Sequence, residues 1–349
     1  MKTIAMNKKL GFGIIGCGII SDFHANAIHE CGNDAELIGV CDVVYDAAEK
    51  FAHRHETNVF KSEAELLACE DIDVVCICTP SGYHHSSVIA AARAGKNIIC
   101  EKPLAINKEQ LDKVEEECIK AGVTVSVISQ NRYAKSIKRV KSALEEGLLG
   151  KIVCADIYMK YYRSQEYYDS GSWRGTKRID GGGALMNQGI HGVDLLLYLA
   201  GDIKSVHAIS KTLVRNIEVE DTLSAIVEYK SGATGVIQAT TSVYPGYPRR
   251  LDINGENGSI VLDETSIVRW DINNQAGHDD VILMPSFTHG AATPTAISHD
   301  GHVLQIADTI KCIREGKSPL SGLADGRRAV DVILAIYKSA EEGKTIYLD

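Results

Sequence analysis

The 349-residue sequence lacks any run of about 18 consecutive apolar residues, the length that a membrane-spanning helix needs. It also lacks a basic block, because 37 Lys and Arg stand against 46 Asp and Glu and give a formal net charge of −9. An acidic chain of this kind binds the phosphates of DNA or RNA poorly. We therefore expect neither a membrane nor a nucleic acid among its partners.

Disorder and collagen-like repeats are excluded by composition, since 45% apolar and 24% charged residues lie near the globular average. Ten cysteines are present, but no two pairs have the spacing of a zinc site, so we expect no metal ion. Cys76 and Cys78 lie in an apolar run and are more simply buried thiols than half of a metal site. Scattered thiols suit a reducing compartment, which indicates the cytoplasm.

A glycine-rich stretch follows the first apolar segment. Residues 10–15 are typical of a buried strand, the stretch Gly16 to Ser21 reads G-x-G-x-x-small, and residues 22–30 can form a helix. The glycines permit a tight turn and close approach of backbone N–H groups to a pyrophosphate at the helix N-terminus. Asp42 ends the next strand, 24 residues after Gly18, where a carboxylate can bind the adenosine ribose. No Arg follows Asp42 directly, so NAD is favoured over NADP.

Strands and helices then alternate, with strands expected at 73–78, 97–100 and 123–128 and helices at 86–94 and 108–121. This order predicts a doubly wound parallel sheet that binds ligands at the carboxyl ends of its strands. Residues 79–84 and 101–103 are two further loops at that edge. The candidate cofactor-binding residues are Gly16, Cys17, Gly18, Ile19, Ile20, Asp42, Thr79, Pro80, His84, Glu101, Lys102 and Gln130.

The pattern changes after about residue 127. Segments rich in β-branched residues predict strands at 152–162, 205–214, 222–229, 233–242 and 259–268, with hairpin turns at 230–232 and 254–258. Helices are expected at 136–147, 189–199, 302–315 and 327–342. The fold class is therefore α/β, with a Rossmann domain at 1–127 and an α+β domain with an open, mostly antiparallel sheet at 128–349. The late helices are also able to pack back on the first domain.

The densest chemical stretch is Gly181 to Asp194. Asn187 and His191 are four residues apart and would share one face of a helix, while Asp194 could orient the histidine ring. Such a histidine can act as a general base on an alcohol. A glycine-rich loop that opens a core helix, with His191 bonded locally, explains the stretch equally well.

Aromatic and basic residues lie just upstream, among them Tyr158, Arg163, Trp173 and Arg174. Aromatic rings with guanidinium groups suit sugar rings and anionic groups, which favours a substrate-binding wall. The alternative is an ordinary sheet face whose tyrosines pack inward and reach water with their hydroxyl groups.

Together these motifs resemble the Gfo/Idh/MocA oxidoreductases over nearly the whole chain. The resemblance is carried by Gly16-Cys17-Gly18, Asp42, Thr79-Pro80 with His84, Glu101-Lys102-Pro103 and the 181–194 segment. It implies hydride transfer between NAD(P) and a sugar or cyclic polyol, and a homo-oligomer, dimer or tetramer, built by packing the C-terminal sheets. It also implies that Lys102 is the catalytic lysine and His191 the catalytic histidine.

The sequence departs from many family members at Asn187, where inositol dehydrogenases have Asp. Asn cannot take a proton but can bind a substrate hydroxyl. This favours a dehydrogenase acting at C3 of a sugar nucleotide, such as UDP-N-acetylglucosaminuronate, or of a sugar or glycoside. An inositol dehydrogenase, a non-catalytic dinucleotide sensor and an enzyme that retains its NAD remain alternatives. The candidate substrate-binding residues are Lys102, Arg132, Tyr158, Arg163, Trp173, Arg174, Asn187 and His191.

Overall fold

The computed structural model describes residues 8–273 and 299–348. The chain divides into two compact units, the first formed by residues 1–130 and 299–327 and the second by residues 131–298 and 328–349. The first unit thus takes in a segment from near the C-terminus. None of the described helices is long and apolar enough to cross a membrane.

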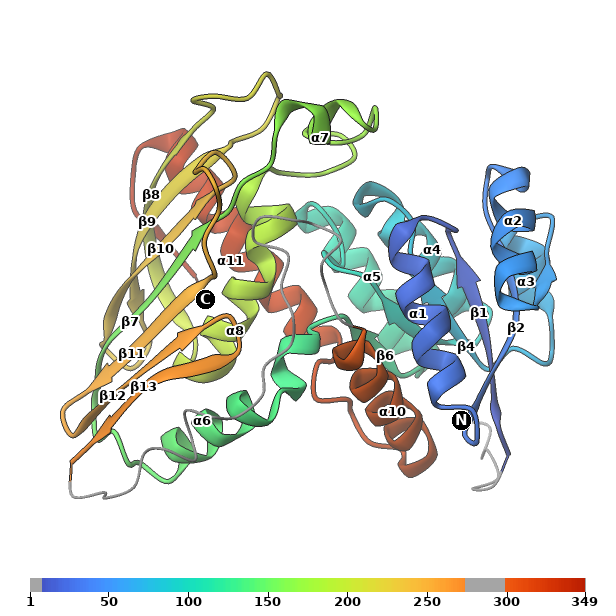
Figure 1. Ribbon diagram of the computed structural model, residues 1–349, viewed down its shortest axis with the longest axis horizontal. Coiled ribbons are helices and arrows are strands. Elements are labelled where there is room, and N and C mark those ends of the chain that lie inside the picture. The colour runs from blue at the N-terminus through green and yellow to red at the C-terminus, as the bar shows by residue number, and fades with distance from the viewer. Residues whose placement is uncertain (1–7, 274–298, 349) are drawn as a thin grey trace. The chain divides into compact units, whose positions relative to one another are not determined.

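A six-stranded parallel sheet forms the first unit (Figure 1), with the strand order β3-β2-β1-β4-β5-β6. Every residue of β1 and β4 is buried, as expected for parallel strands with both faces covered. The strands are β1 Leu10–Ile15, β2 Ala35–Cys41, β3 Asn58–Val59, β4 Val74–Ile77, β5 Asn97–Cys100 and β6 Val125–Val127. The helices are α1 Ile19–Glu30, α2 Tyr45–His55, α3 Glu63–Ala68, α4 Ser81–Arg93, α5 Lys108–Ala121 and α10 Asp300–Glu315.

The strand order reverses between β1 and β4, the point at which open α/β sheets bind ligands outside the carboxyl ends of their strands. The loops that follow β1, β2, β4 and β5 begin at that edge. They hold most of the predicted cofactor-binding residues, so the fold places these loops along one edge of the sheet.

An eight-stranded sheet forms the second unit, with the order β13-β12-β11-β7-β10-β9-β8-β14. Its pairs are antiparallel except for β7 with β10, which is parallel. The strands are β7 Ile152–Lys160, β8 Ile203–Lys211, β9 Thr222–Tyr229, β10 Thr234–Thr240, β11 Arg250–Gly255, β12 Gly258–Asp263, β13 Ser266–Ile272 and β14 Ile346–Tyr347. The other elements are the 3-10 helix η1 Gln130–Tyr133, which straddles the division between the units, α6 Lys135–Glu145, α7 Gln165–Asp169, the π-helix η2 Ala184–Gly189, α8 Ile190–Ala200 and α11 Leu323–Glu342. These two sheets confirm the predicted fold class.

Two local predictions are wrong. Residues 79–84 are not all loop, because α4 begins at Ser81 and Pro80 is its extended N-cap residue, as suits a ring that fixes φ near the start of a helix. Residues 259–268 are not one strand, because β12 and β13 form a hairpin that turns at Glu264, whose φ is +52°. The sequence of that turn contains no Gly, Pro or Asn, the residues that usually indicate a turn. Glu264 is held instead by a backbone hydrogen bond and a side-chain ion pair from Arg249.

Helix α10 is tied into the first unit by one amide side chain. Gln305 is fully buried; its Oε1 accepts from the Ser129 N–H (3.0 Å), and its Nε2 donates to Ser126 Oγ (3.0 Å) and to the Val127 carbonyl (2.8 Å). Ile306 and Ile310 on the same helix join the hydrophobic core around β1 and β2. The C-terminal segment therefore completes the first unit.

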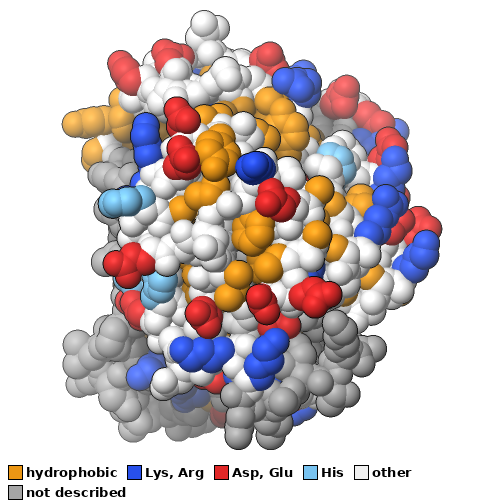
Figure 2. Space-filling view, turned by 90° about the vertical axis from the view of Figure 1, so that its right-hand side faces the viewer, with side chains coloured by type: hydrophobic (Ala, Val, Ile, Leu, Met, Phe, Trp, Pro, Cys, Tyr) orange, Lys and Arg blue, Asp and Glu red, His pale blue; other side chains and the backbone are white. Residues whose placement is uncertain are grey.

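The surface in Figure 2 shows acidic and basic side chains interspersed with hydrophobic ones. Among the described side chains of this face there is no continuous basic area of the kind that binds nucleic-acid phosphates.

We expect Gln305→Leu to lower the free energy of unfolding by about 2 kcal/mol or more, because each buried group left without its hydrogen bond costs about 1–3 kcal/mol. Urea denaturation followed by fluorescence measures this change. The control is Lys311→Gln at an exposed position of the same helix, which should change little. Equal midpoints for Gln305→Leu and the wild type would contradict the role assigned to this side chain.

Candidate active site

The glycine-rich loop leaves β1 in a conformation that requires glycine. Gly16 has a φ of +94°, and a Cβ added there would lie 2.8 Å from the carbonyl group of Cys78. A Cβ on Gly18 would instead meet no atom within 4 Å. Gly18 is the N-cap residue of α1, and no described side chain caps that helix end. The loop thus offers an open cradle at the positive end of a helix, which fits the pyrophosphate of a dinucleotide.

Asp42 lies directly after β2 and contacts this loop. Its Oδ2 accepts the Cys17 N–H at 2.7 Å and its Oδ1 accepts the Val44 N–H at 2.8 Å. Burial, and then the nearby Asp42 carboxylate, raise the pKa of the Cys17 thiol to about 12. The carboxylate therefore fixes the loop from the position predicted for ribose binding, and Cys17 stays a neutral thiol.

His84 joins two of the edge loops. Its ring is buried, with Nδ1 2.6 Å from the Pro103 carbonyl oxygen and Nε2 2.7 Å from the Thr79 carbonyl oxygen. Both nitrogens are thus engaged by backbone, and His84 connects the loops after β4 and β5; its contact with the cofactor stays a prediction. Burial lowers the pKa of His84, and the two carbonyl groups oppose that effect.

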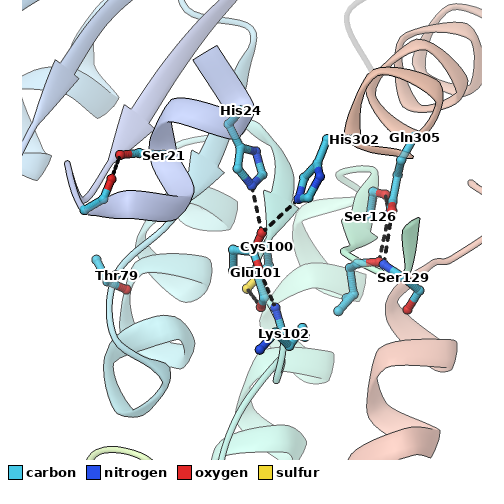
Figure 3. A network of polar contacts seen from close by, with 12 residues as sticks. Ser21, His24, Thr79, Cys100, Glu101, Lys102, Ser126, Ser129, His302 and Gln305 are labelled. Carbon is cyan, nitrogen blue, oxygen red and sulfur yellow. Dashed lines mark hydrogen bonds and ion pairs between the residues drawn. The ribbon is translucent and has the colours of Figure 1, made fainter. Parts of the chain in front are cut away.

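Glu101 and Lys102 follow β5, and the Lys102–Pro103 peptide bond is cis. Glu101 is buried with one oxygen facing two buried histidines, His24 of α1 and His302 of α10 (Figure 3). Lys102 is half-buried and follows directly in the chain. Gln130, the last predicted cofactor-binding residue, is half-buried, and its Oε1 has no hydrogen-bond partner among the described residues.

In the second unit, a buried carboxylate holds the segment that carries Asn187 and His191. Glu220 accepts the Gly183 N–H and the Leu185 N–H, each at 2.9 Å, and the Tyr337 hydroxyl at 2.8 Å. A Cβ on Gly183 would lie 1.8 Å from the Glu220 carbonyl oxygen. Burial raises the pKa of Glu220, and these hydrogen bonds oppose the rise. The three-glycine stretch is therefore required where the backbone passes against Glu220.

Asn187 lies in the π-helix and His191 in the first turn of α8, and both are half-buried. Asn187 Nδ2 donates to Asp180 Oδ1 at 2.6 Å, while Asp180 Oδ2 accepts the Gly175 N–H at 2.7 Å. The Asp180 carboxylate therefore binds the Asn187 amide nitrogen and fixes the orientation of the amide group.

Arg132 is not placed as a substrate ligand. It is buried and makes two hydrogen bonds to Asp194, from Nε at 2.9 Å and from a terminal nitrogen at 2.6 Å, with its guanidinium 4.8 Å from the Tyr198 ring. The pair joins η1 to α8. Asp194 is thus a partner of Arg132, and its role in orienting the His191 ring stays a prediction.

The predicted aromatic and basic wall is only partly assembled. The Arg174 guanidinium lies 4.4 Å from the ring centres of both Trp173 and Tyr167, and Arg163 lies 5.7 Å from Tyr167. Tyr167 accepts hydrogen bonds from Arg174 at 2.7 Å and from Gln188 at 3.3 Å. We call Arg163, Tyr167, Trp173 and Arg174 the arginine–aromatic cluster; Gln188 connects it to the π-helix that holds Asn187.

Tyr158 is not part of this cluster. Successive residues of a strand face opposite sides, and Met159 of β7 lies against Gly189 and Gly192, beside His191. Tyr158 therefore faces the other side of the sheet, opposite Arg250 and Gln238 on the neighbouring strands. A period-two pattern alone could not say which side α8 covers.

Several residues that contact the predicted ones were missed from the sequence. His24, His302, Glu220 and Asp180 act on the predicted residues through side-chain contacts between distant segments. His24 alone offered a signal, since it lies in the helix that follows the glycine-rich loop.

Two family models match the chain. The model described as an oxidoreductase family with an NAD-binding Rossmann fold matches residues 10–129, and the GFO/IDH/MocA C-terminal domain matches residues 137–261. Their combined extent is more than half of the chain. The sequence prediction of an NAD-dependent oxidoreductase is thereby confirmed.

Individual relatives are similar over most of their length. The WlbA dehydrogenase from Bordetella pertussis, whose crystal structure is a complex with NADH and UDP-GlcNAcA, is 34% identical, with 98% of this chain and 99% of that chain covered and a TM-score of 0.88. A myo-inositol 2-dehydrogenase from Thermotoga maritima is 28% identical over 97% of this chain and 98% of its own length. A D-glucoside 3-dehydrogenase from Escherichia coli is 28% identical over 69% of this chain and 72% of its own. On these grounds the chain belongs to the Gfo/Idh/MocA family of NAD-binding oxidoreductases.

Proposed function

We propose that this enzyme oxidises the C3 hydroxyl of a sugar nucleotide with NAD. The observation that carries this proposal is the arginine–aromatic cluster next to the π-helix, where Gln188 connects Tyr167 and Arg174 to the segment holding Asn187. Guanidinium groups with aromatic rings suit an anionic sugar derivative better than a neutral polyol. The similarity to the dehydrogenase bound to UDP-GlcNAcA supports a negatively charged, nucleotide-linked sugar.

The roles follow from the chemistry of each side chain. Bound NAD supplies the acceptor for the hydride. His191 takes the hydroxyl proton, and the Lys102 ammonium group donates a hydrogen bond to the same oxygen as negative charge develops on it. Asn187, with its amide nitrogen donating to Asp180, positions a neighbouring hydroxyl group. A neutral amide at this place cannot accept a proton, which leaves His191 as the base.

An inositol dehydrogenase is the second candidate, because the Thermotoga relative matches nearly the whole chain. A panel of UDP-sugars, glycosides, free sugars and inositols, tested with NAD and with NADP, separates the two by the absorbance of the reduced cofactor. Formation of NADH from UDP-GlcNAcA but not from myo-inositol supports the proposal, and the reverse favours the second candidate. Binding of NAD without turnover of any compound would favour a sensor, and NADH already bound to the purified protein would favour an enzyme that retains its cofactor.

We also propose a homo-oligomer that forms through the face of the eight-stranded sheet away from α8. The strand register places Ile209, Ile226 and Val236 on that face, and the residues Ile209 and Ile226 are 63% and 65% exposed. Figure 1 shows α8 on the other face. Apolar side chains gathered on one sheet face suit packing against a second copy. The ten free cysteines support residence in the reducing cytoplasm.

Lys102→Ala and His191→Ala should each lower kcat by about 100-fold or more, because groups that transfer the proton or stabilise the developing negative charge contribute on this scale. Steady-state NADH formation measures the effect. Lys120→Ala and His53→Ala, at exposed positions, serve as matched controls and should keep wild-type turnover. Near-normal turnover in both test variants would refute the assigned roles.

Arg174→Met should raise the KM for UDP-GlcNAcA about tenfold or more while changing the KM for NAD little, because it removes a charge from the arginine–aromatic cluster and keeps much of the side-chain volume. Initial-rate kinetics measure both constants. Arg178→Met, at a nearby exposed position, is the matched control. An unchanged KM for the anionic sugar would argue against this cluster as the anion-binding wall.

Ile226→Lys should shift the protein towards the monomer, because a charge placed on the exposed sheet face opposes its burial against a second copy. Size-exclusion chromatography with light scattering reports the mass. Thr234→Lys, exposed on the neighbouring strand near its end, is the comparison variant and should disturb assembly less. The same oligomer in wild type and Ile226→Lys would contradict assembly through this face.

A further inference from the structure

Two histidines from distant segments meet on one carboxylate beneath Lys102. Glu101 Oε1 lies 3.0 Å from His24 Nε2 and 3.5 Å from His302 Nε2, and the two rings are 5.3 Å apart in an edge-to-face arrangement. All three side chains are almost completely buried. Figure 3 shows the two rings, from α1 and α10, pointing at the same oxygen.

This group is charged although it is enclosed. Burial by itself would raise the pKa of Glu101, but the hydrogen bond from His24 and the contact with His302 hold that pKa well below its usual range. Glu101 is therefore a carboxylate at neutral pH. A buried ionic contact of this sort contributes little to the free energy of unfolding. Well-packed apolar side chains of similar volume often contribute as much or more. Folding alone therefore gives little reason for three ionisable side chains at this place.

The carboxylate acts on the backbone of the next residue. Glu101 Oε2 accepts the Lys102 N–H at 3.3 Å, and on the other side the Pro103 carbonyl oxygen is held by His84 at 2.6 Å. The main chain on both sides of Lys102 is thus fixed by buried side chains. The lysine side chain is long and flexible, so the position of its ammonium group depends on how firmly the backbone is fixed.

We propose that His24 and His302 are positioning residues for Lys102, which they hold in its reactive direction through the Glu101 carboxylate. This inference rests on the proposed function, in which Lys102 binds the reacting oxygen. It assigns a role in the reaction to α10, a helix from the C-terminal part of the chain that no dinucleotide-binding motif includes. Both imidazole groups face the carboxylate, with His24 Nε2 at hydrogen-bond distance and His302 Nε2 at 3.5 Å.

The test compares His302→Leu with His302→Gln, and His24→Leu with His24→Gln. Leu removes the polar contact, whereas the Gln amide can offer an N–H near the place of the ring Nε2. We expect each Leu variant to lower kcat at least tenfold while the KM for NAD stays within threefold, and each Gln variant to recover most of kcat. His299→Leu, at the half-buried N-cap of α10, removes a histidine contact with a different carboxylate, that of Glu30; it is the matched control and should keep wild-type kcat.

Action through Glu101 is tested by a double-mutant cycle. In a Glu101→Gln background, His302→Leu should lower kcat by less than twofold, because the carboxylate on which it acts is gone. An independent tenfold loss in that background would overturn the proposal, and so would Leu and Gln variants of equal activity. Stoichiometric zinc or nickel in the purified protein, lost in His302→Gln, would show a metal centre and would also overturn it.

A readout without substrate separates this proposal from the proposed function. An amine-reactive reagent followed by peptide mass spectrometry gives the labelling rate of Lys102 relative to exposed Lys120. We expect His302→Leu to change that ratio at least threefold and His302→Gln to leave it near the wild-type value. If Lys102→Ala abolishes turnover but His302→Leu changes neither kcat nor this ratio, the positioning role fails alone. If Lys102→Ala keeps turnover, the proposed function fails, whatever the labelling shows.

Discussion

A buried carboxylate must be paired, and this constraint organises the first unit around Glu101. The loop after β5 presents Glu101 to His24 of α1 and to His302 of α10, so three segments far apart in the sequence converge on one oxygen. Gln305, one turn further along α10, ties the same helix to β6. The C-terminal segment therefore joins the dinucleotide-binding unit through the contact of His302 with Glu101 as well as through the hydrogen bonds of Gln305.

The second unit repeats the same principle with a different carboxylate. Glu220 accepts two backbone N–H groups from the start of the glycine-rich segment and the hydroxyl of Tyr337. Gly183 is needed because any side chain would collide with the backbone of Glu220. The fixed segment continues into the π-helix, which carries Asn187, and then into α8, which carries His191. In each unit, therefore, the side chain that we propose to be reactive follows closely after backbone that an internal carboxylate holds in place.

The parts of this arrangement that follow from local rules could be predicted from the sequence. The Gly16–Gly18 turn, Asp42 at the end of its strand and the change from parallel to antiparallel strands depend on chain-local geometry, and the predicted fold class is confirmed. Contacts between segments that are far apart in the chain could not be predicted from these local rules. Arg132 was expected among the substrate-binding residues but is buried against Asp194. Tyr158 faces the side of the sheet away from α8, and the strand pattern alone does not say which face a helix covers. His302 carried no signal, since its partner lies about 200 residues earlier.

The central claim is that hydride leaves C3 of a nucleotide-linked sugar, and isotope transfer tests it most directly. UDP-GlcNAcA deuterated at C3 would be incubated with NAD and the enzyme, and the NADH formed would be analysed by mass spectrometry. We predict deuterated NADH and a slower rate of its formation than with the unlabelled sugar. Unlabelled NADH from this substrate, or no NADH at all under conditions in which another sugar or an inositol is oxidised, would contradict it.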